Sequence, residues 1–387
     1  MKVLMLASMP NADNPSKGIF NQRAAVNIGE LVDLHVLSLR VWRPGRPMLI
    51  EEVQDNYSVW HFALPHKPDT RPWISYLNHL IVSRLILSKL RGRLQDFDLI
   101  HSAAGSYAPL GSFLANLARA KHLVQLTGSD VYSEFPSIKS TLHVRSMLES
   151  IDMVVGNSKA LVKDFNKLFK TEYQENVVYR GIDLDMFRRQ KLAGAGPVFL
   201  FIGGLSQYVH YRHQMNTKGG LTLMTAWKQL ENQMVTHNAK LLFGGPDTPN
   251  ELLNNWISTL KHPNLVEIIG MICPKKIQSL YARSTVVLVP SMEEGMPNVG
   301  VEAMASGRMV IGAAVGGVPE LIDDRYNGFV FSPGDAKDLA NCLLLTALSQ
   351  QKVQEMGERS RVKVERDFDA RNFAPSYYKF YTSICVV

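Results

Sequence analysis

The sequence has 387 residues, of which 46% are hydrophobic and 20% are charged, and its formal net charge is +7. This length suits two α/β domains better than one compact core, and the composition is typical of a globular chain. No stretch of the sequence has the roughly 18 consecutive apolar residues that a membrane-spanning helix needs, which excludes such a helix. The three cysteines lie far apart, which excludes a disulfide framework. We therefore expect a cytoplasmic protein whose basic charge favours anionic partners.

The first half of the chain alternates short apolar runs with amphipathic stretches. Helical patterns lie between the apolar runs, for example at 18–31 and 105–119. Strands are expected at 2–7, 33–39, 58–63, 99–101, 122–126, 153–156 and 177–179. Strand–helix alternation of this kind predicts a parallel sheet with helices on both faces.

A polar and basic stretch rich in glycine and alanine, 188–197, reads as a linker between two domains. A second alternation follows it, with strands expected at 198–202, 240–243, 266–269, 286–289, 309–312 and 329–331. Helices are expected to begin near Gly219, Asn250, Pro274, Asn298, Asp335 and Gln351, and the tail at 372–384 forms an aromatic amphipathic helix. We predict a first domain at 1–190, joined by a C-terminal helix at 371–387, and a second domain at 196–370.

The stretch 288–320 carries the most chemistry. A buried strand ends at Pro290, a loop follows, and a helix opens at Asn298. Ligands of doubly wound folds bind at the carboxyl ends of the strands, and a helix N-terminus offers free N–H groups to phosphate. Glu294 and Glu302 can therefore point into one cleft and accept hydrogen bonds from sugar hydroxyls. The alternative is a pair of solvated glutamates, although the apolar neighbours of Glu302 make its face of the helix less polar than that requires.

Several segments together resemble the retaining family-4 glycosyltransferases of the GT-B fold. The segments EGMPNVGVE (294–302), AMASG (303–307) and VGGVPELI (315–322) are similar to the donor-site signature of that family. Looser matches are KGIF (17–20), GNSK (156–159) and GID (181–183). The resemblance implies an α/β architecture of two facing Rossmann-like domains, each a doubly wound parallel sheet, with a C-terminal helix that returns to the first domain.

The resemblance also implies roles for individual residues. Glu302 is expected to bind the ribose of a nucleotide, and Glu294 the transferred sugar. Lys218 is expected to neutralise the leaving diphosphate, although it also fits an ordinary surface lysine. The remaining donor-site residues by resemblance are Gly18 near the phosphates, Met271 and Ile272 against the base, and Gly295, Met296, Pro297, Asn298 and Val299 with amides for the sugar and diphosphate.

Two departures from the family pattern affect these roles. The family has Gly-Arg-Leu where this chain has Gly203-Gly204-Leu205, and Arg212 in the segment that follows is a candidate to supply the missing charge. Thr127 stands where many members have a catalytic histidine. The role of that histidine is expected to be shared. Asp130 is a candidate catalytic group, and His101 and Thr127 are candidates on the acceptor side. Each also fits a plain residue at a strand end.

The expected function is transfer of a sugar, with retention of configuration, from a nucleoside diphosphate sugar to a glycan or lipid-linked acceptor. Cell-surface polysaccharide or glycolipid biosynthesis is the expected setting. No metal, other cofactor or nucleic acid is expected. The Asp183-Leu184-Asp185 triplet has the DxD form of metal-dependent transferases, but it lies in a turn that favours a structural role. The alternative is a catalytically silent GT-B relative that serves as a partner or scaffold in a polysaccharide assembly complex.

The segment 71–95 contains five basic residues and no acidic ones, with apolar residues at broadly helical spacing. A basic amphipathic helix can bind an anionic membrane surface, which would place the protein peripherally on the inner face of the membrane. A core helix with a solvated basic edge is the alternative.

Overall fold

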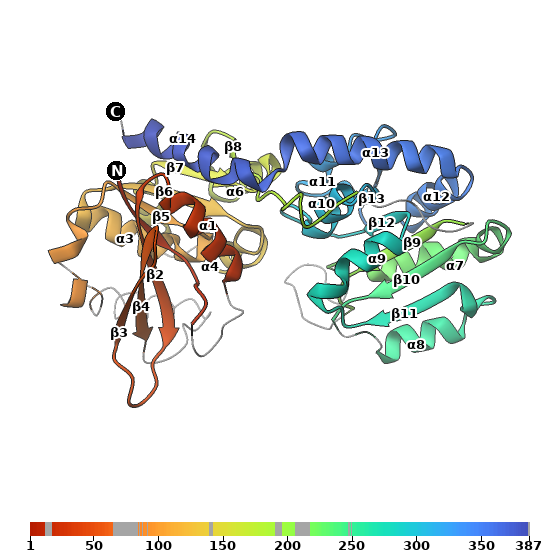
Figure 1. The fold of residues 1–387 in the computed structure, drawn as a ribbon, viewed down its shortest axis with the longest axis horizontal. Coiled ribbons are helices and arrows are strands. Elements are labelled where there is room, and N and C mark those ends of the chain that lie inside the picture. Colours follow the sequence, from red (N-terminus) through yellow and green to blue (C-terminus); the bar gives the residue numbers. More distant parts are fainter. Residues whose placement is uncertain are drawn as a thin grey trace. The chain divides into compact units, whose positions relative to one another are not determined.

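The computed structural model describes residues 1–11, 18–64, 84, 86, 88–90, 92–138, 142–189, 196–205, 217–246, 248 and 250–385. The chain forms two compact units, one of Met1–Val178 with Arg371–Val387 and the other of Tyr179–Ala370 (Figure 1). The division lies ahead of the linker expected at 188–197. The reason is that the backbone N–H of Ile182 donates to Phe368 O at 2.8 Å and Phe187 is buried in the core of the second unit.

The first unit is built on an eight-stranded sheet in the order β3-β4-β2-β1-β5-β6-β7-β8, parallel except for β3, which pairs antiparallel with β4. Its strands are β1 Lys2–Leu6, β2 Asp33–Val41, β3 Leu49–Val53, β4 Tyr57–Leu64, β5 Leu99–Ser102, β6 Lys121–Leu126, β7 Met153–Gly156 and β8 Asn176–Val177. The order reverses between β1 and β5, which makes that point the topological switch of the sheet.

Helices cover both faces of this sheet, so successive strand residues, whose side chains point to opposite faces, are buried alike. Val3 and Met5 of β1 face the cluster that includes α1 and α14, whereas Leu4 faces the cluster that includes α3. The helices are α1 Ile19–Gly29, α3 Ala108–Ala118, α4 Phe135–Ile138, α5 Leu142–Glu149, α6 Lys159–Phe169 and α14 Phe373–Cys385, with a 3-10 turn at Gly105–Tyr107 and a π-helical turn at Asp130–Glu134. The C-terminal helix α14 thus belongs to the first unit (Figure 1).

The second unit contains a fully parallel six-stranded sheet in the order β11-β10-β9-β12-β13-β14. Its strands are β9 Val198–Ile202, β10 Lys240–Gly244, β11 Val266–Gly270, β12 Val286–Val289, β13 Met309–Ala313 and β14 Gly328–Phe331. This is the strand order of a Rossmann fold, and its switch point lies between β9 and β12.

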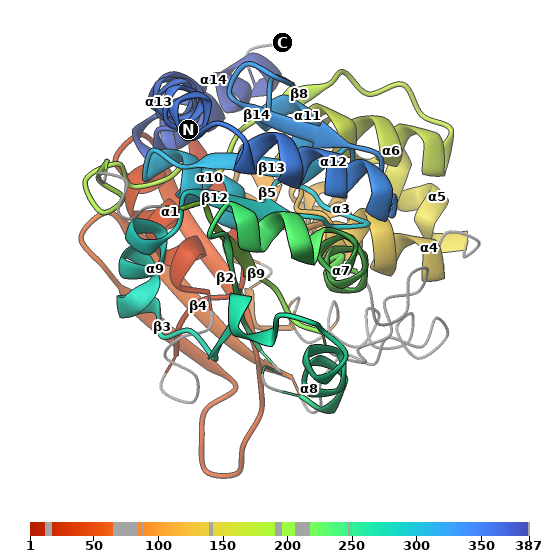
Figure 2. The same ribbon diagram turned by 90° about the vertical axis from the view of Figure 1, so that its right-hand side faces the viewer.

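The helices of the second unit form a layer on each side of its sheet. Phe199 and Phe201 of β9 pack in the cluster with α7 and α12, which lie side by side in Figure 2, and Leu200 packs in the cluster with α9 and α10. The helices are α7 Gly220–Thr236, α8 Glu251–Ser258, α9 Ile277–Arg283, α10 Asn298–Ala305, α11 Val318–Leu321, α12 Ala336–Ala347 and α13 Gln350–Asp367, with 3-10 turns at Pro263–Leu265, Pro274–Lys276 and Ala370–Asn372.

The observed strands follow the sequence-based expectation closely, with β3 as the exception. That strand is a short edge strand in which Glu51 and Glu52 are exposed, so it lacks the apolar run that marks the others. Within the described residues, no helix combines the length and hydrophobicity that crossing a membrane requires.

Candidate active site

The loops at the carboxyl ends of β9 and β12 bring two of the expected residues together, Lys218 and Glu294. The Lys218 ammonium group donates to Glu294 Oε2 at 2.8 Å, and Ser291 Oγ donates to the same oxygen at 3.1 Å. The Lys218 side chain is 46% exposed and that of Glu294 only 14%. A carboxylate and an ammonium group are therefore held at the switch point, and the ammonium remains accessible to solvent.

Two glycines allow the backbone segments of this edge to approach closely. Gly219, which precedes α7, has φ 73°, and a Cβ atom there would come within 1.6 Å of Pro290 O. Gly316 has φ 49°, and a Cβ atom there would come within 1.5 Å of Glu294 O. Any other residue at either position would push the Lys218 or Glu294 backbone away, because left-handed φ values and contacts this short exclude a side chain.

The loop after Glu294 leads directly into α10. The Gly295 carbonyl accepts from the Gly317 N–H at 2.7 Å, and the helix begins at the exposed Asn298 with no side chain capping it. The first N–H groups of a helix have no partner within it and carry partial positive charge. The start of α10 therefore offers backbone donors suited to an anionic ligand.

Glu302 lies in the second turn of α10 and is half-buried. Its Oε2 accepts from the Tyr281 hydroxyl at 2.8 Å. Burial raises the pKa of Glu302, and the Tyr281 hydrogen bond opposes that rise. A small cavity of about 30 Å³ adjoins it, lined by Arg180, Gly181, Ile182, Met296, Asn298, Val301, Glu302 and Phe368. Glu302 is thus a constrained carboxylate beside a small cavity rather than a freely solvated one.

The two residues expected near the base lie just past the end of β11. Met271 is 72% exposed, whereas Ile272 is half-buried and its Cδ1 lies 2.9 Å from where a Cβ atom of Gly244 would stand. Ile272 therefore fills the space that a side chain at Gly244, the last residue of β10, would need. An exposed methionine next to this packed isoleucine provides the apolar surface that a planar base would need.

Asp130 in the first unit has a different environment from the one expected. It is 1% exposed, and its carboxylate accepts from the backbone N–H groups of Gly105, Thr127, Gly128 and Val131 at 2.8 to 3.1 Å. Proton transfer to Asp130 would weaken these charge-assisted bonds. We therefore correct its assignment from a catalytic group to one that holds the loop after β6.

Thr127 stands at the exposed end of β6, and its hydroxyl donates to Asp130 Oδ2 at 3.1 Å. His101 of β5 is only 1% exposed, and its Nδ1 lies 2.7 Å from the Tyr381 hydroxyl of α14. Its ring also packs against Tyr377, with centroids 5.0 Å apart. An acceptor cannot contact a side chain enclosed in this way. The expected acceptor-side role of His101 is therefore corrected to one in packing α14.

Other expected residues are placed only in part. Gly18 precedes α1 with φ 78°, and a Cβ atom there would lie 2.1 Å from Ser8 O, so this loop passes tightly over the end of β1. Arg212 lies outside the described residues, as does most of 71–95. The described residues include no group of three side chains suited to hold a metal ion.

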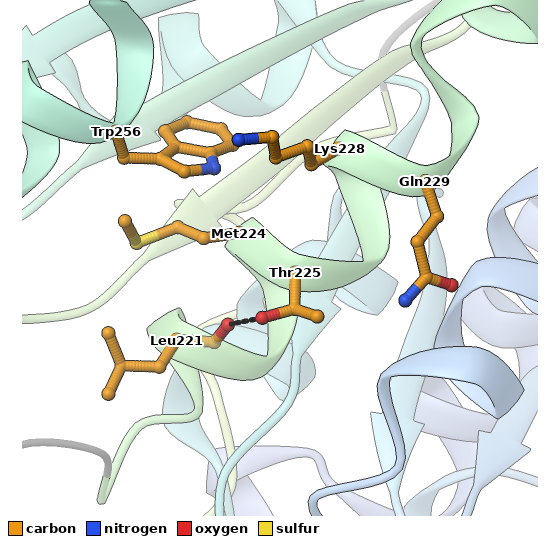
Figure 3. Close-up of a pocket in the computed structure, with 6 residues that line it drawn as sticks. All are labelled: Leu221, Met224, Thr225, Lys228, Gln229 and Trp256. Atoms are coloured by element: carbon orange, nitrogen blue, oxygen red, sulfur yellow. Dashed lines mark hydrogen bonds between the residues drawn. The ribbon is translucent and has the colours of Figure 1, made fainter. Parts of the chain in front are cut away.

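A separate hollow of the second unit lies between α7 and α8 (Figure 3). Lys228 extends alongside the Trp256 ring in this view, and its ammonium group donates to Thr259 Oγ1 at 2.8 Å. The lining residues are Leu221, Met224, Thr225, Lys228, Gln229 and Trp256. None of the expected donor-site residues that the structure describes lines this hollow.

Ser291 and Tyr281, which donate hydrogen bonds to Glu294 and Glu302 respectively, were not predicted to have roles. Ser291 lies two residues after the end of β12, and a hydroxyl near a strand end was the available signal for its contact with Glu294. Tyr281 precedes β12 on α9, and nothing in its local sequence indicates a partner 21 positions away.

The comparisons with known proteins agree with this geometry. Residues 196–347 match the sequence profile of the family described as Glycosyl transferases group 1. Anabaena HepE in complex with UDP has a structure that matches 99% of this chain and 100% of its own, with a TM-score of 0.69 and 19% identity. The chain is a GT-B glycosyltransferase. Both the resemblance to that family and the α/β fold class are thereby confirmed.

Curated relatives of this glycosyltransferase span most of its length. The N-acetyl-alpha-D-glucosaminyl L-malate synthase of Bacillus anthracis is 23% identical over 295 residues, which cover 75% of this chain and 76% of the relative. An uncharacterized glycosyltransferase of Methanocaldococcus jannaschii is 25% identical over 270 residues, or 69% and 70% of the two chains. The structure of sucrose-phosphate synthase from Thermosynechococcus elongatus matches all of both chains with a TM-score of 0.71 and 18% identity.

Proposed function

We propose that this glycosyltransferase moves a sugar from a nucleoside diphosphate sugar to a glycan or lipid-linked acceptor, with retention of configuration. The observation that carries the proposal is the group of Lys218, Glu294 and the α10 N-terminus at the switch point of the second sheet. Glu302 would accept from the ribose, and Met271 with Ile272 would flank the base. The UDP complex of Anabaena HepE, which has the same fold, supports a nucleotide in such a unit.

The proposed chemistry needs charge stabilisation more than a protein base. The bond between the sugar C1 and the diphosphate oxygen breaks, and the acceptor oxygen bonds to C1 on the same face. The acceptor proton passes to the departing phosphate. Lys218 and the N–H groups at the start of α10 stabilise the negative charge that develops on that phosphate, which is the task a metal ion performs in other transferases.

The ion pair between Lys218 and Glu294 fits this sequence of events. The pair is open to solvent on its lysine side, where water can replace the contact, so its rearrangement costs little. On donor binding Lys218 would turn to the diphosphate and Glu294 to the sugar hydroxyls. Cell-surface polysaccharide or glycolipid synthesis is the setting we propose for the reaction.

Nucleotide binding tests this proposal first. A ligand that binds only the folded protein raises its thermal unfolding temperature. We expect one of UDP, GDP and ADP to raise that temperature in a concentration-dependent way, and the matching nucleoside to raise it much less. If none of the three changes the unfolding temperature at millimolar concentration, the proposed donor site is wrong.

A further inference from the structure

Tyr281 is a buried tyrosine whose single polar atom reaches the candidate active site. It lies on α9, its side chain is 0% exposed, and its ring packs among the apolar residues between the sheet and α10. Its hydroxyl donates to Glu302 Oε2 at 2.8 Å. A buried tyrosine hydroxyl needs such a partner, because leaving it unbonded costs free energy. Packing alone would be served equally well by phenylalanine.

The backbone of Tyr281 is itself fixed by a buried cation. Arg308, at 1% exposure, donates from Nε to the Tyr281 carbonyl at 2.7 Å. Arg308 precedes β13, so the end of α9 is tied to the sheet at the point where the tyrosine ring enters the core. The Tyr281 hydroxyl therefore has little freedom to leave Glu302.

Different polar groups lie on the two sides of Glu302. On the side of α9, the Tyr281 hydroxyl donates to its carboxylate. On the other side is the small cavity, which Arg180 and Asn298 also line. Burial raises the pKa of Tyr281 well above its ordinary value, so the phenol keeps the proton that it donates. The pKa of Glu302 is raised by burial and lowered by this hydrogen bond.

We propose that Tyr281 is a positioning residue for the nucleotide site, holding one oxygen of Glu302 so that the other faces the ribose hydroxyls as an ionised acceptor. The inference rests on the proposed function, since the ribose is the ligand that Glu302 is proposed to bind. Tyr281 itself touches no substrate. It acts by fixing the rotamer of Glu302 and by favouring its charged form, which is the stronger hydrogen-bond acceptor.

The first measurement needs no nucleotide. The Glu302 side-chain carboxyl is titrated by NMR in protein labelled with 13C-glutamate, and its signal is identified by its loss in Glu302→Gln. We expect Tyr281→Phe to raise the pKa of Glu302, because the variant keeps the ring but removes the donor. Tyr173→Phe is the matched control, since the Tyr173 hydroxyl donates to Leu148 O at 3.0 Å in the first unit. An unchanged Glu302 titration in Tyr281→Phe overturns the inference.

The second measurement is a double-mutant cycle at several pH values for the affinity of whichever of UDP, GDP and ADP the wild type binds, written here for UDP. Tyr281→Phe should weaken UDP binding about three- to tenfold at pH 7, the range expected for one hydrogen bond, and the loss of affinity on acidification should begin at higher pH. In a Glu302→Ala background the same substitution should have no further effect on UDP binding. An effect of equal size in that background would mean a general packing defect and would overturn the inference. If the wild type binds no nucleoside diphosphate, the proposed function fails, while the Glu302 titration still decides the role of Tyr281.

Discussion

Glu294 and Glu302 differ in what the protein does with each carboxylate. Glu294 shares an oxygen between Lys218 and Ser291 near the surface, whereas Glu302 is held by one buried tyrosine. A carboxylate paired with an accessible ammonium group can exchange partners when a ligand arrives. A carboxylate fixed from behind is suited to bind one constant group of the ligand. We therefore expect substitutions of the two residues to have separable effects.

Glu294→Gln should lower turnover while leaving the affinity for the nucleoside diphosphate nearly intact, because it alters contact with the sugar rather than with the ribose. Thr127→Ala should cost under about 1.4 kcal/mol in activation free energy, a factor of ten in rate. The measurement is the transfer rate of both variants at saturating donor. A crippled Thr127→Ala beside a mild Glu294→Gln would place the key catalytic group in the first unit instead.

Glu302→Ala should weaken nucleoside diphosphate binding by about 1.5–3 kcal/mol, because the ribose hydroxyls lose a charged acceptor. Titration calorimetry measures the affinity directly. Glu358→Ala on the exposed face of α13 serves as the control and should leave it unchanged. Equal affinities for the wild type and Glu302→Ala would remove Glu302 from the site.

Among the secondary-structure elements, α14 is held against the first sheet by contacts with residues far away in the sequence. Its Tyr381 meets His101 of β5, 280 positions earlier in the chain. Burial lowers the pKa of His101 to about 3, so the imidazole is neutral in the folded protein at pH 7. Burial also lowers the pKa of His122, to about 4.

These histidines predict an acid-sensitive first unit. An unfolded histidine takes up a proton near pH 6.5, whereas folded His101 does so only near pH 3, so stability is lost as pH falls between these values. Each such histidine contributes a slope of about 1.4 kcal/mol per pH unit in that window. Urea unfolding of the wild type and His101→Gln between pH 7 and 4.5 measures the slopes. We expect a shallower slope in the variant; parallel slopes would mean that His101 is protonated in the folded protein.

Element positions were predictable where the signal is local. The strand 286–289 is a run of buried apolar residues, and α10 begins at Asn298 where the helical spacing starts. The contacts of Tyr281, Asp130 and His101 were not predictable, because each depends on a partner that the sheet brings together from another element. Asp130 was considered catalytic because the nearby Thr127 stands where the family has a histidine, and no sequence motif marked the Gly105 N–H that holds its carboxylate.

The basic segment 71–95 is the candidate for binding an anionic membrane surface. Its described part packs into the first unit. Ile86, Leu90 and Leu94 are fully buried there, and Arg93 pairs with Glu51. This part therefore follows the core-helix alternative, and its exposed Arg84 and Lys89 form a basic edge.

We expect partial sedimentation of the protein with anionic vesicles through this edge, reduced by salt and by glutamine at Arg84 and Lys89. Neutral vesicles are the control. The same bound fraction on neutral and anionic vesicles would leave only the packing role for the segment.

As a whole molecule, the proposed enzyme breaks the bond between a sugar and a nucleoside diphosphate by means of Lys218 and the start of α10. The most direct measurement is the release of nucleoside diphosphate from UDP-, GDP- and ADP-sugars by purified protein in EDTA. We expect release above background from one donor class, surviving EDTA and strongly reduced in Glu294→Gln. No release from any donor, as for a catalytically silent relative, or release only after manganese or magnesium is restored, would contradict the account.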